Sequence, residues 1–304
     1  MAQANEVFDK IAATIAGKLE SGVRPWSKPW TARGSALALP RNIEGRAYRG
    51  ANTFWLWMEQ EAKGYAEPVW MTFKQAKARG GSVRKGEKGT PVFFWSRTTK
   101  EDAATGETTS RFFAKVYTVF NIAQCEGVEL PEAAPASILP EAERIAAADA
   151  LIVATGAEVR HGGSKAFYTP TFDRIHLPAF ADFINADGYY STAFHELGHW
   201  TGAEHRLNRT FGREFGDEAY AFEELVAELT AAFVCASQGF ASVERDDHAA
   251  YIGHWAARIR SNPKAFIQAC TKAQTAADYI LKAAEADAAQ EPQGEAAEAL
   301  ALAA

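Results

Sequence analysis

The stretch Phe194-His195-Glu196-Leu197-Gly198-His199-Trp200 sets the framework for interpreting the rest of the chain. Two histidines four residues apart lie on one face of an α-helix, where both can bind the same metal ion. Glu196, directly after the first histidine, is then placed to act as a general base on a water at that ion. Zinc suits such a site because three protein ligands leave a fourth position open, with manganese or another divalent ion as the alternative. The stretch therefore predicts a metal-dependent hydrolytic centre on a helix, which Ser191 or Thr192 is expected to cap.

A first candidate for the third metal ligand is His205. The spacing His195-Glu196-x-x-His199-x-x-Gly202-x-x-His205 fits the metzincin pattern, in which the glycine turns the chain and the last histidine completes the site. That class also requires a methionine turn downstream of the motif. All methionines of the chain precede the motif, at Met1, Met58 and Met71. The metzincin arrangement therefore lacks one of its defining parts.

A second candidate is Glu224, within the run Glu223-Glu224-Leu225-Val226-Ala227-Glu228. The apolar residues from here to Phe233 predict a helix on which Glu224 and Glu228 share one face. This spacing matches the gluzincin arrangement, in which the first carboxylate binds the metal and the second orients a histidine ligand. We favour Glu224 over His205 as the third ligand, with Glu228 in the orienting position. Glu223 lies on another face of this helix and is expected to be structural.

Charge is divided unevenly along the chain. The formal net charge is −6, but residues 1–100 hold 17 Lys and Arg against 8 Asp and Glu, a balance of +9. The remaining 204 residues hold 15 against 30, a balance of −15. Six of the eight tryptophans also lie in the first hundred residues. A chain of 304 residues is long enough for two domains, and this asymmetry predicts that they do different work.

Composition also bears on the compartment. No apolar run approaches the ~20 residues that a membrane-spanning helix needs, and the amino terminus lacks the apolar region of a signal peptide. The three cysteines, Cys125, Cys235 and Cys270, are too scattered for a disulfide framework or a cysteine-based zinc site. We therefore expect a cytoplasmic protein with no membrane partner.

The amino-terminal part is predicted to mix helices and strands. Apolar residues recur every three to four positions over residues 4–21, which indicates an amphipathic helix. A glycine-rich basic loop at 80–90 leads into a strand at 91–95. Its expected partner is the strand at 111–120, in a hairpin across the polar segment 100–109. This part of the chain is therefore α+β.

Basic residues interleaved with aromatic residues are typical of proteins that bind single-stranded nucleic acid. Cationic side chains follow the phosphates, and exposed rings stack on unpaired bases at ~1–3 kcal/mol each. The candidate DNA-binding residues are Arg41, Tyr48, Arg49, Asn52, Lys74, Arg84, Lys85 and Lys88. The alternative is that the tryptophans form a core and the basic residues a solvated face. The glycine-rich loop lacks the Gly-Lys-Ser/Thr ending of a nucleotide-binding P-loop.

The carboxy-terminal part is separated by a proline- and acid-rich segment that reads as a linker. The expected division is an amino-terminal domain at 1–126, a linker at 127–140, a metallopeptidase domain at 141–284 and a disordered tail at 285–304. Residues 165–177 predict two short strands around a turn. Extended edge strands of this kind can hold a peptide substrate through main-chain pairing.

Several motifs together resemble the ArdC antirestriction family. The segments that carry the resemblance are Pro25-Trp26-Ser27-Lys28-Pro29-Trp30, Tyr48-Arg49-Gly50-Ala51-Asn52, Val83-Arg84-Lys85-Gly86-Glu87-Lys88, Val119-Phe120-Asn121, His195 to Gly202, Arg206-Leu207-Asn208-Arg209 and Glu223 to Leu229. The resemblance implies an amino-terminal domain that binds single-stranded DNA and a carboxy-terminal zincin-like metallopeptidase domain. Residue by residue, His195, Glu196, His199 and Glu224 match the family's metal and catalytic positions.

The resemblance also implies a plasmid-borne protein that shields conjugative DNA from host restriction. Relatives include plasmid primases of the TraC type, but this sequence contains no primase signature. The leading hypothesis is thus an antirestriction protein with an α+β DNA-binding domain and a zinc metallopeptidase domain whose protein substrate is unidentified. One alternative is a metalloprotease recruited by DNA to cut associated proteins. The other is a DNA-binding module whose metal site is purely structural.

Overall fold

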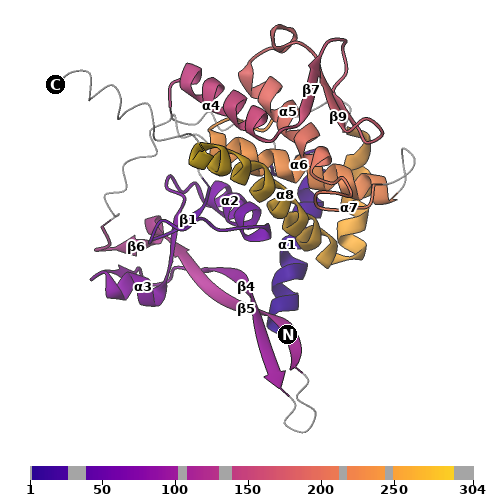
Figure 1. Cartoon of the computed structure of the whole chain (residues 1–304). Coiled ribbons are helices and arrows are strands. Elements are labelled where there is room, and N and C mark those ends of the chain that lie inside the picture. Colours follow the sequence, from indigo (N-terminus) through magenta and orange to yellow (C-terminus); the bar gives the residue numbers. More distant parts are fainter. Residues whose placement is uncertain are drawn as a thin grey trace, which may run out of the picture. The chain divides into compact units, whose positions relative to one another are not determined.

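The computed structural model describes residues 2–26, 39–101, 108–129, 139–211, 218–243 and 249–290 (Figure 1). Contacts divide these residues into two compact units. The first unit comprises the described residues within Met1–Lys28, Leu37–Ser137 and Glu244–Thr271. The second comprises those within Ile138–Val243 and Lys272–Ala304. Both units mix helices and strands, so the predicted α+β class is confirmed.

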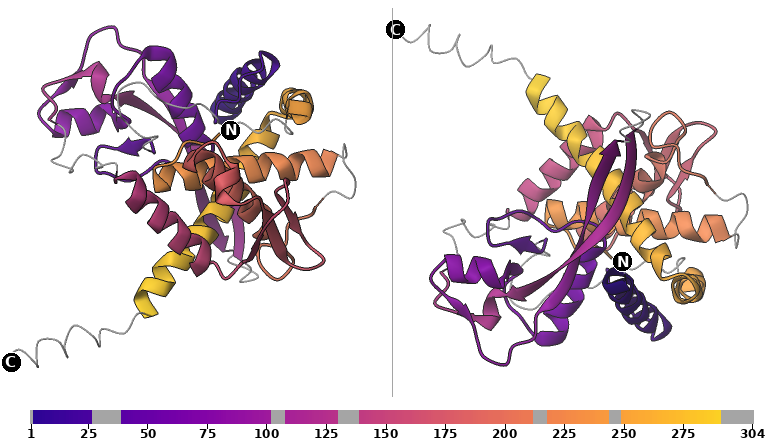
Figure 2. Two further views of the ribbon diagram at one scale, coloured as in Figure 1. Left: turned by 90° about the horizontal axis from the view of Figure 1, so that it is seen from above. Right: turned by 90° about the horizontal axis from the view of Figure 1, so that it is seen from below.

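A four-stranded sheet forms the framework of the first unit. Its strand order is β1 (Arg41–Asn42), β2 (Val69–Thr72), β5 (Thr108–Asn121) and β4 (Thr90–Glu101). The β1 and β2 strands are parallel, and the other neighbours are antiparallel. Together, β4 and β5 form a long twisted hairpin, which is easily followed in Figure 2. A small second sheet pairs β3 (Ser82–Val83) with β6 (Cys125–Glu126). The expected pairing of 91–95 with 111–120 is confirmed.

Helices cover this sheet through their apolar faces. The α1 helix (Ala2–Glu20) buries Ile11, Ile15 and Leu19, at the spacing that predicted it. The α2 helix (Ala51–Lys63) is buried over its first two turns. The short α3 helix (Phe73–Ala78) begins at a capping box, in which Thr72 accepts from the Gln75 amide.

The core of the first unit also contains residues from near the end of the chain. Trp26 and Phe54 pack against Trp255 of α7 (Ala249–Ser261) and Phe266 of α8 (Pro263–Gln290), with ring centroids 6.0–6.4 Å apart. Contacts therefore group Glu244–Thr271 with the amino-terminal unit, whereas the sequence division placed this segment in the metallopeptidase domain. Helical periodicity identifies a buried face but does not identify the partner of that face.

The second unit places a small sheet beside a helix pair. The sheet has the order β7 (Glu158–His161), β9 (Arg174–Leu177) and β8 (Phe167–Thr169), with β8 an antiparallel edge strand. The helices are α4 (Glu141–Ala154), α5 (Ala186–Trp200), α6 (Glu218–Gln238) and the part of α8 from Lys272 onward. The two short strands expected within 165–177 are confirmed as β8 and β9.

Close packing of α5 against α6 depends on Gly198. A Cβ at this position would lie 3.1 Å from the Cα of Ala227 and 3.3 Å from the Cβ of Thr230. The glycine thus lets the two backbones approach each other, which sets the distance between side chains on their facing surfaces. The α5 helix begins earlier than expected, because the Asn185 carboxamide accepts from the Gly188 amide and caps it, and Ser191 and Thr192 are buried inside it.

Some expectations fall outside the described residues. These are Trp30, most of the linker at 130–138, and the tail from residue 291. Within the described part, α8 extends to Gln290, into the segment expected to be a tail. No described helix combines the length and apolarity needed to cross a membrane. Cys235 and Cys270 are buried, Cys125 is partly buried, and none forms a disulfide.

Candidate metal centre and nucleic-acid surface

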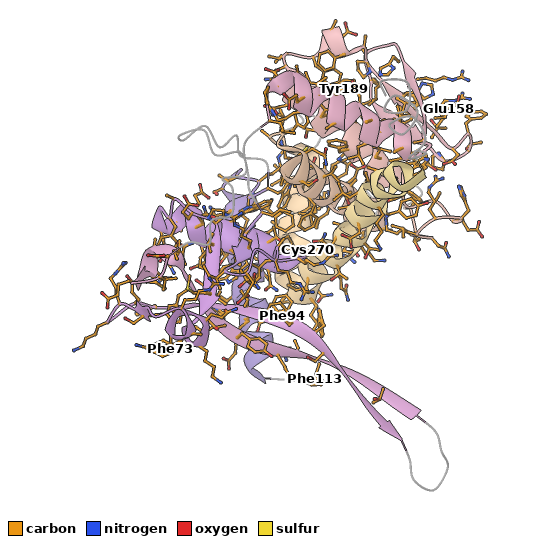
Figure 3. All side chains as sticks on the ribbon, turned by 60° about the vertical axis from the view of Figure 1, so that its left-hand side comes forward. Phe73, Phe94, Phe113, Glu158, Tyr189 and Cys270 are labelled. Atoms are coloured by element: carbon orange, nitrogen blue, oxygen red, sulfur yellow. The ribbon has the colours of Figure 1, made fainter. Side chains whose placement is uncertain are left out.

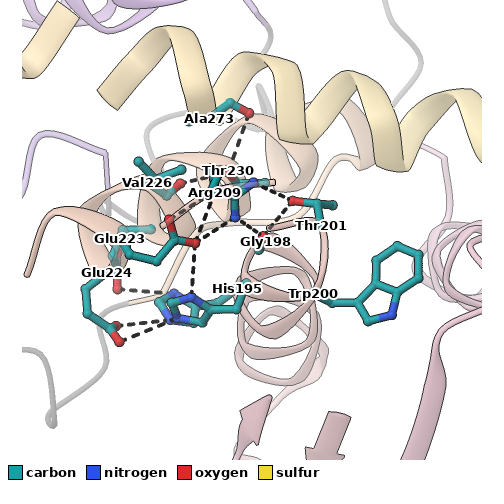
Figure 4. Close-up of polar contacts among 12 residues, drawn as sticks. His195, Gly198, Trp200, Thr201, Arg209, Glu223, Glu224, Val226, Thr230 and Ala273 are labelled. Atoms are coloured by element: carbon teal, nitrogen blue, oxygen red, sulfur yellow. Dashed lines mark hydrogen bonds and ion pairs between the residues drawn. The ribbon is translucent and has the colours of Figure 1, made fainter. Parts of the chain in front are cut away.

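The facing surfaces of α5 and α6 bring two histidines and one carboxylate together (Figure 4). The Nε2 atoms of His195 and His199 are 3.1 Å apart. Glu224 extends from α6 with Oε2 3.5 Å from His195 Nε2 and Oε1 3.5 Å from His199 Nε2. One ligand atom from each of the three residues lies within 4.8 Å of the others. This is the disposition of donors that a single divalent ion requires.

His205 lies away from this cluster. The α5 helix ends at Trp200, and the following loop is fixed by Arg206, whose guanidinium lies 3.8 Å from the Trp200 ring centroid and donates to the Trp200 carbonyl. Arg206 also forms an ion pair with Asp173. His205 is beside this pair, 3.3 Å from Asp173, with its side chain 64% exposed. The structure thus brings Glu224, and not His205, to the two motif histidines.

A carboxylate also faces the second nitrogen of each histidine ring. Glu228 lies 3.8 Å from His195 Nδ1, which is the position expected for it. Glu223 lies 3.5 Å from His199 Nδ1, although the sequence suggested only a structural role for this residue. Carboxylates in such positions orient a histidine ligand and increase its basicity. The sequence spacing could have indicated the role of Glu223. If the two helices are antiparallel, and His195 lies opposite Glu228, then His199 lies opposite a residue about four positions earlier, near Glu223.

Arg209 holds Glu223 in place. Its guanidinium donates to both Glu223 oxygens, at 2.7–3.2 Å, and also to the Gly198 carbonyl and the Thr201 hydroxyl. Both partners of this ion pair are buried. Arg209 therefore ties α6 to the end of α5, so the loop after the motif contributes to the geometry of the centre. Sequence spacing gave no indication of this contact.

The centre gathers several carboxylates in a buried environment. Four glutamates are buried here, namely Glu196, Glu223, Glu224 and Glu228, and Arg209 is the buried arginine that pairs with one of them. Buried charges are retained when they are paired or coordinate a metal. A divalent ion held by the two histidines and Glu224 would be stabilised by these carboxylates, so the donor set fits the metal that a zincin-like site implies.

The pKa shifts of His199 and Glu224 also indicate a site for a positive ion. Burial acts to lower its pKa, but the Glu224 carboxylate and the hydrogen bond to Glu223 outweigh burial and raise the pKa to about 10. Burial likewise acts to raise the pKa of Glu224, yet the two histidines hold that pKa far below its usual range. The space between these side chains therefore strongly favours positive charge.

An aromatic ring lies beside this cluster. The Phe211 ring lies 6.4 Å from His199 and 6.2 Å from Tyr168 on the edge strand β8. A Cβ at Gly202 would come within 2.7 Å of the Phe211 ring, so the glycine leaves room for it. His176 of β9 stacks on Phe167 of β8, with ring centroids 4.7 Å apart.

The expected DNA-binding residues of the first unit fall into two groups. Most are on the surface: Arg49, Lys74, Arg84, Lys85 and Lys88 are exposed, and Arg41 is partly exposed. The loop that carries Arg84 is held in one conformation, because Arg84 pairs with Glu87 and donates to the Ala123 carbonyl. These exposed side chains lie where a phosphate backbone could reach them.

Tyr48 and Asn52 are buried instead. Tyr48 packs in a core cluster with Trp70 and Val92, and burial raises the pKa of its hydroxyl. The Asn52 carboxamide donates to the Phe93 carbonyl at 2.6 Å and accepts from the Phe93 amide at 3.1 Å. The Asn52 side chain thus forms the hydrogen bonds with the outer edge of β4 that a neighbouring strand would otherwise form. Neither side chain presents a surface to DNA, because both serve packing.

The tryptophans divide in a similar way. Trp26, Trp55, Trp57 and Trp70 are buried, in agreement with the alternative that they form a core, while Trp95 is exposed. Other rings that sequence analysis did not single out are exposed as well, notably Phe94 of β4 and Tyr117 of β5. Strand alternation alone could not separate these positions, because both faces of the predicted hairpin carry aromatic residues.

Family models match both parts of the chain. Residues 5–120 match the N-terminal domain of the anti-restriction factor ArdC, and residues 146–272 match a zincin-like metallopeptidase domain. The Sinorhizobium fredii protein y4eC is 41% identical over 284 residues, which cover 90% of this chain and 91% of that protein. The DNA primase TraC of Escherichia coli is 37% identical over 92% of this chain, which spans only 28% of that longer protein.

Solved structures give the same result. The crystal structure of the metal-free antirestriction protein ArdC from plasmid R388 has a TM-score of 0.77 and 39% identity to this chain. The Mn(II)-bound structure of that protein has a TM-score of 0.74 and 38% identity. In both cases the similarity covers 91% of this chain and 97% of the other.

Proposed function

The chain belongs to the ArdC antirestriction family and contains a zincin-like domain, and from this premise we propose that it binds single-stranded DNA and protects incoming conjugative DNA from host restriction. Support for DNA binding comes from the exposed basic residues of the first unit, among them Arg49, Lys74 and Lys85. Cationic side chains of this kind bind phosphates without regard to sequence, as protection of any incoming strand requires. The protein acts in the cytoplasm in this proposal.

The proposed ligands of a divalent ion are His195, His199 and Glu224, with Glu228 and Glu223 orienting the two histidine rings. The observation that carries this assignment is the cluster of three donor atoms within 4.8 Å of one another, two of them on buried residues, with further buried carboxylates beside it. Zinc is the proposed metal because three protein ligands leave one position open. Manganese is the alternative, which the Mn(II)-bound relative supports.

The proposed reaction is peptide hydrolysis with Glu196 as the general base. A divalent ion bound here supplies Lewis acidity to the peptide carbonyl and to the attacking water. The Glu196 carboxylate, buried beside His195, accepts a proton from that water and delivers it to the nitrogen of the leaving amine. An extended peptide can pair with the main chain of β8, which is an edge strand packed against α5.

Two alternatives share this site. In the first, DNA recruits the metallopeptidase to cut proteins associated with the strand. The position of Glu196 next to the ligand cluster favours this alternative, because a general base is needed for hydrolysis. In the second, the metal serves stability alone and DNA binding accounts for protection. The substitution Glu196→Gln separates them, because it removes the base and retains the proposed ligands.

The test compares wild type and Glu196→Gln in metal content, single-stranded DNA binding, casein hydrolysis in the presence of single-stranded DNA, and protection of conjugative DNA. We expect metal content and DNA binding to be unchanged and hydrolysis to fall by about 10²–10⁴-fold. Loss of protection in this variant would support a role for hydrolysis in antirestriction. Full protection with unchanged DNA binding would exclude the peptidase from that role. Failure of wild type to bind single-stranded DNA would contradict the proposal as a whole.

A further inference from the structure

The β4–β5 hairpin carries a group of outward-facing rings that the proposed function has not yet used. Phe94 is 46% exposed and Tyr117 is 44% exposed, with ring centroids 5.6 Å apart in an edge-to-face arrangement. Phe113 is partly exposed, and the exposed Lys115 places its amine 5.5 Å from the Phe113 ring centroid. We call these four residues the hairpin platform. Figure 3 shows Phe94 and Phe113 along the hairpin.

Strand register puts the four residues on one face of the hairpin. Phe94 pairs with Lys115, and the pairs on either side along the same face are Val92 with Tyr117 and Ser96 with Phe113. The residues between them in sequence point to the opposite face. On that opposite face, Phe93 and Trp95 contact Phe8 of α1 at 4.7 and 6.0 Å. The helix thus covers Phe93, which is buried, while Trp95 is 55% exposed. On the platform face Val92 is buried in the core cluster, and Phe94 and Tyr117 are exposed.

The core beneath fixes the platform in position. Tyr48 contacts Phe94 at 6.3 Å and belongs to the buried cluster that also contains Val92 and Val119. The Asn52 carboxamide holds the backbone of Phe93, next to Phe94. Tyr48 and Asn52, which the sequence suggested as DNA contacts, thus support the rings that are available for contact. A ring that is already immobilised loses little entropy when it binds.

We propose that the hairpin platform stacks unpaired bases of single-stranded nucleic acid, with Phe94 and Tyr117 as the principal rings and Lys115 as a phosphate contact. This inference rests on the proposed DNA-binding function and identifies the surface that performs it. Exposed aromatic residues on a sheet, with cations beside them, are a common platform for unpaired bases because every base has a π-face. Arg49, which follows Tyr48 in the sequence, is another exposed cation of the same unit.

The charge of the platform favours nucleic acid over a second copy of the chain. In a two-fold dimer the same patch of each subunit is buried against its equivalent. The Lys115 ammonium, in the middle of the rings, would then be buried near its equivalent, which is unfavourable without a counter-charge. A phosphate supplies that counter-charge. The positive balance of the first hundred residues acts in the same direction.

The test uses the full chain and two fluorescent oligothymidylates of equal length, one intact and one with abasic positions. For wild type we expect tighter binding of the intact strand, since stacking requires bases. Phe94→Ala and Tyr117→Ala should each weaken binding of the intact strand by roughly five- to a hundredfold and change binding of the abasic strand much less. Phe94→Tyr should restore most of the affinity. Phe172→Ala is the matched control, because Phe172 is 66% exposed but lies in the second unit.

The outcomes separate this inference from the proposed function. If wild type binds neither strand, both fail. If wild type binds both strands equally and the platform variants bind as wild type does, DNA binding stands and the platform assignment is overturned. If Phe94→Ala abolishes a concentration-dependent dimer in sedimentation without affecting DNA binding, the platform is a subunit interface and the inference is again overturned. Comparable loss of affinity in Phe94→Tyr and Phe94→Ala would also contradict stacking.

Discussion

The metal centre and the hairpin platform differ in how they hold their functional groups. At the centre, charged side chains are withdrawn from water, and ion pairs such as that of Glu223 with Arg209 hold several of them. At the platform, the rings are about half exposed, and uncharged residues such as Tyr48 and Val92 support them. The buried charge pairs of the centre fix the positions of its side chains, so a substitution that removes one partner is strongly destabilising. On the hairpin platform each ring contributes separately to binding, so a single substitution removes only part of the affinity.

The largest effect is expected from breaking a buried charge pair. Arg209→Ala leaves the Glu223 carboxylate buried without its guanidinium partner, which should lower the free energy of unfolding by about 3–5 kcal/mol. Denaturant unfolding measures this change. The matched control is Arg160→Ala, because Arg160 forms an exposed pair with Glu158 in the same unit and should show no measurable change. Equal effects of the two substitutions would contradict the distinction between buried and exposed charge.

A somewhat smaller effect on the free energy of unfolding is expected when the pH of the metal-free protein is raised. The pKa of His199 is raised to about 10 when folded, against about 6.5 for an unperturbed histidine. Protonation therefore stabilises the folded state fully below about pH 6.5, and this contribution is lost as the pH rises through the folded value. The free energy of unfolding should fall by a few kcal/mol (order of magnitude) between pH 7 and pH 10.

The measurement is denaturant unfolding of chelator-treated protein between pH 7 and pH 10. Zinc-loaded protein should show a weaker dependence, because the ion replaces the proton between the rings. His199→Gln removes the titrating group and should also flatten the profile. A metal-free protein that is as stable at pH 10 as at pH 7 would contradict the stabilisation of protonated His199 by Glu224 and Glu223.

The smallest effect is expected at an exposed cation of the first unit. Lys85→Ala should reduce affinity for single-stranded DNA slightly and lower the slope of log affinity against log salt by about 0.7, the value for one phosphate contact. Lys165→Ala, an exposed lysine of the second unit, is the control and should leave the slope unchanged. Fluorescence anisotropy over a salt series measures both. Identical slopes in wild type and Lys85→Ala would remove this lysine from the DNA surface.

What the sequence predicted well was local in the chain. The positions of His195 and His199 follow from helical spacing, as does the shared face of Glu224 and Glu228. The missing methionine turn disfavours His205 as a ligand, and in the structure His205 lies away from the two motif histidines. These inferences needed no knowledge of which elements pack together beyond the pairing of two helices.

What the sequence missed depends on contacts between distant elements. Glu223 gains its position from Arg209 and His199, and neither contact is visible in the spacing of one helix. The exposure of Phe94 depends on which face of the hairpin α1 covers. Trp255 and Phe266 show helical periodicity, but only packing identifies Trp26 and Phe54 as their partners. Asn52 is predicted as a DNA contact, but its carboxamide bonds the backbone of Phe93, a contact between distant segments that the sequence does not reveal.

The most direct test of the central claim is the affinity of the chain for Zn²⁺ and Mn²⁺ in Glu224→Ala and His205→Ala, measured by isothermal titration calorimetry. The account predicts that Glu224→Ala loses more than the 10- to 100-fold that removal of an orienting residue costs, because it removes a ligand, while His205→Ala binds metal as wild type does. Circular dichroism confirms that both variants are folded. A large loss in His205→Ala, with Glu224→Ala binding as wild type does, would contradict the account.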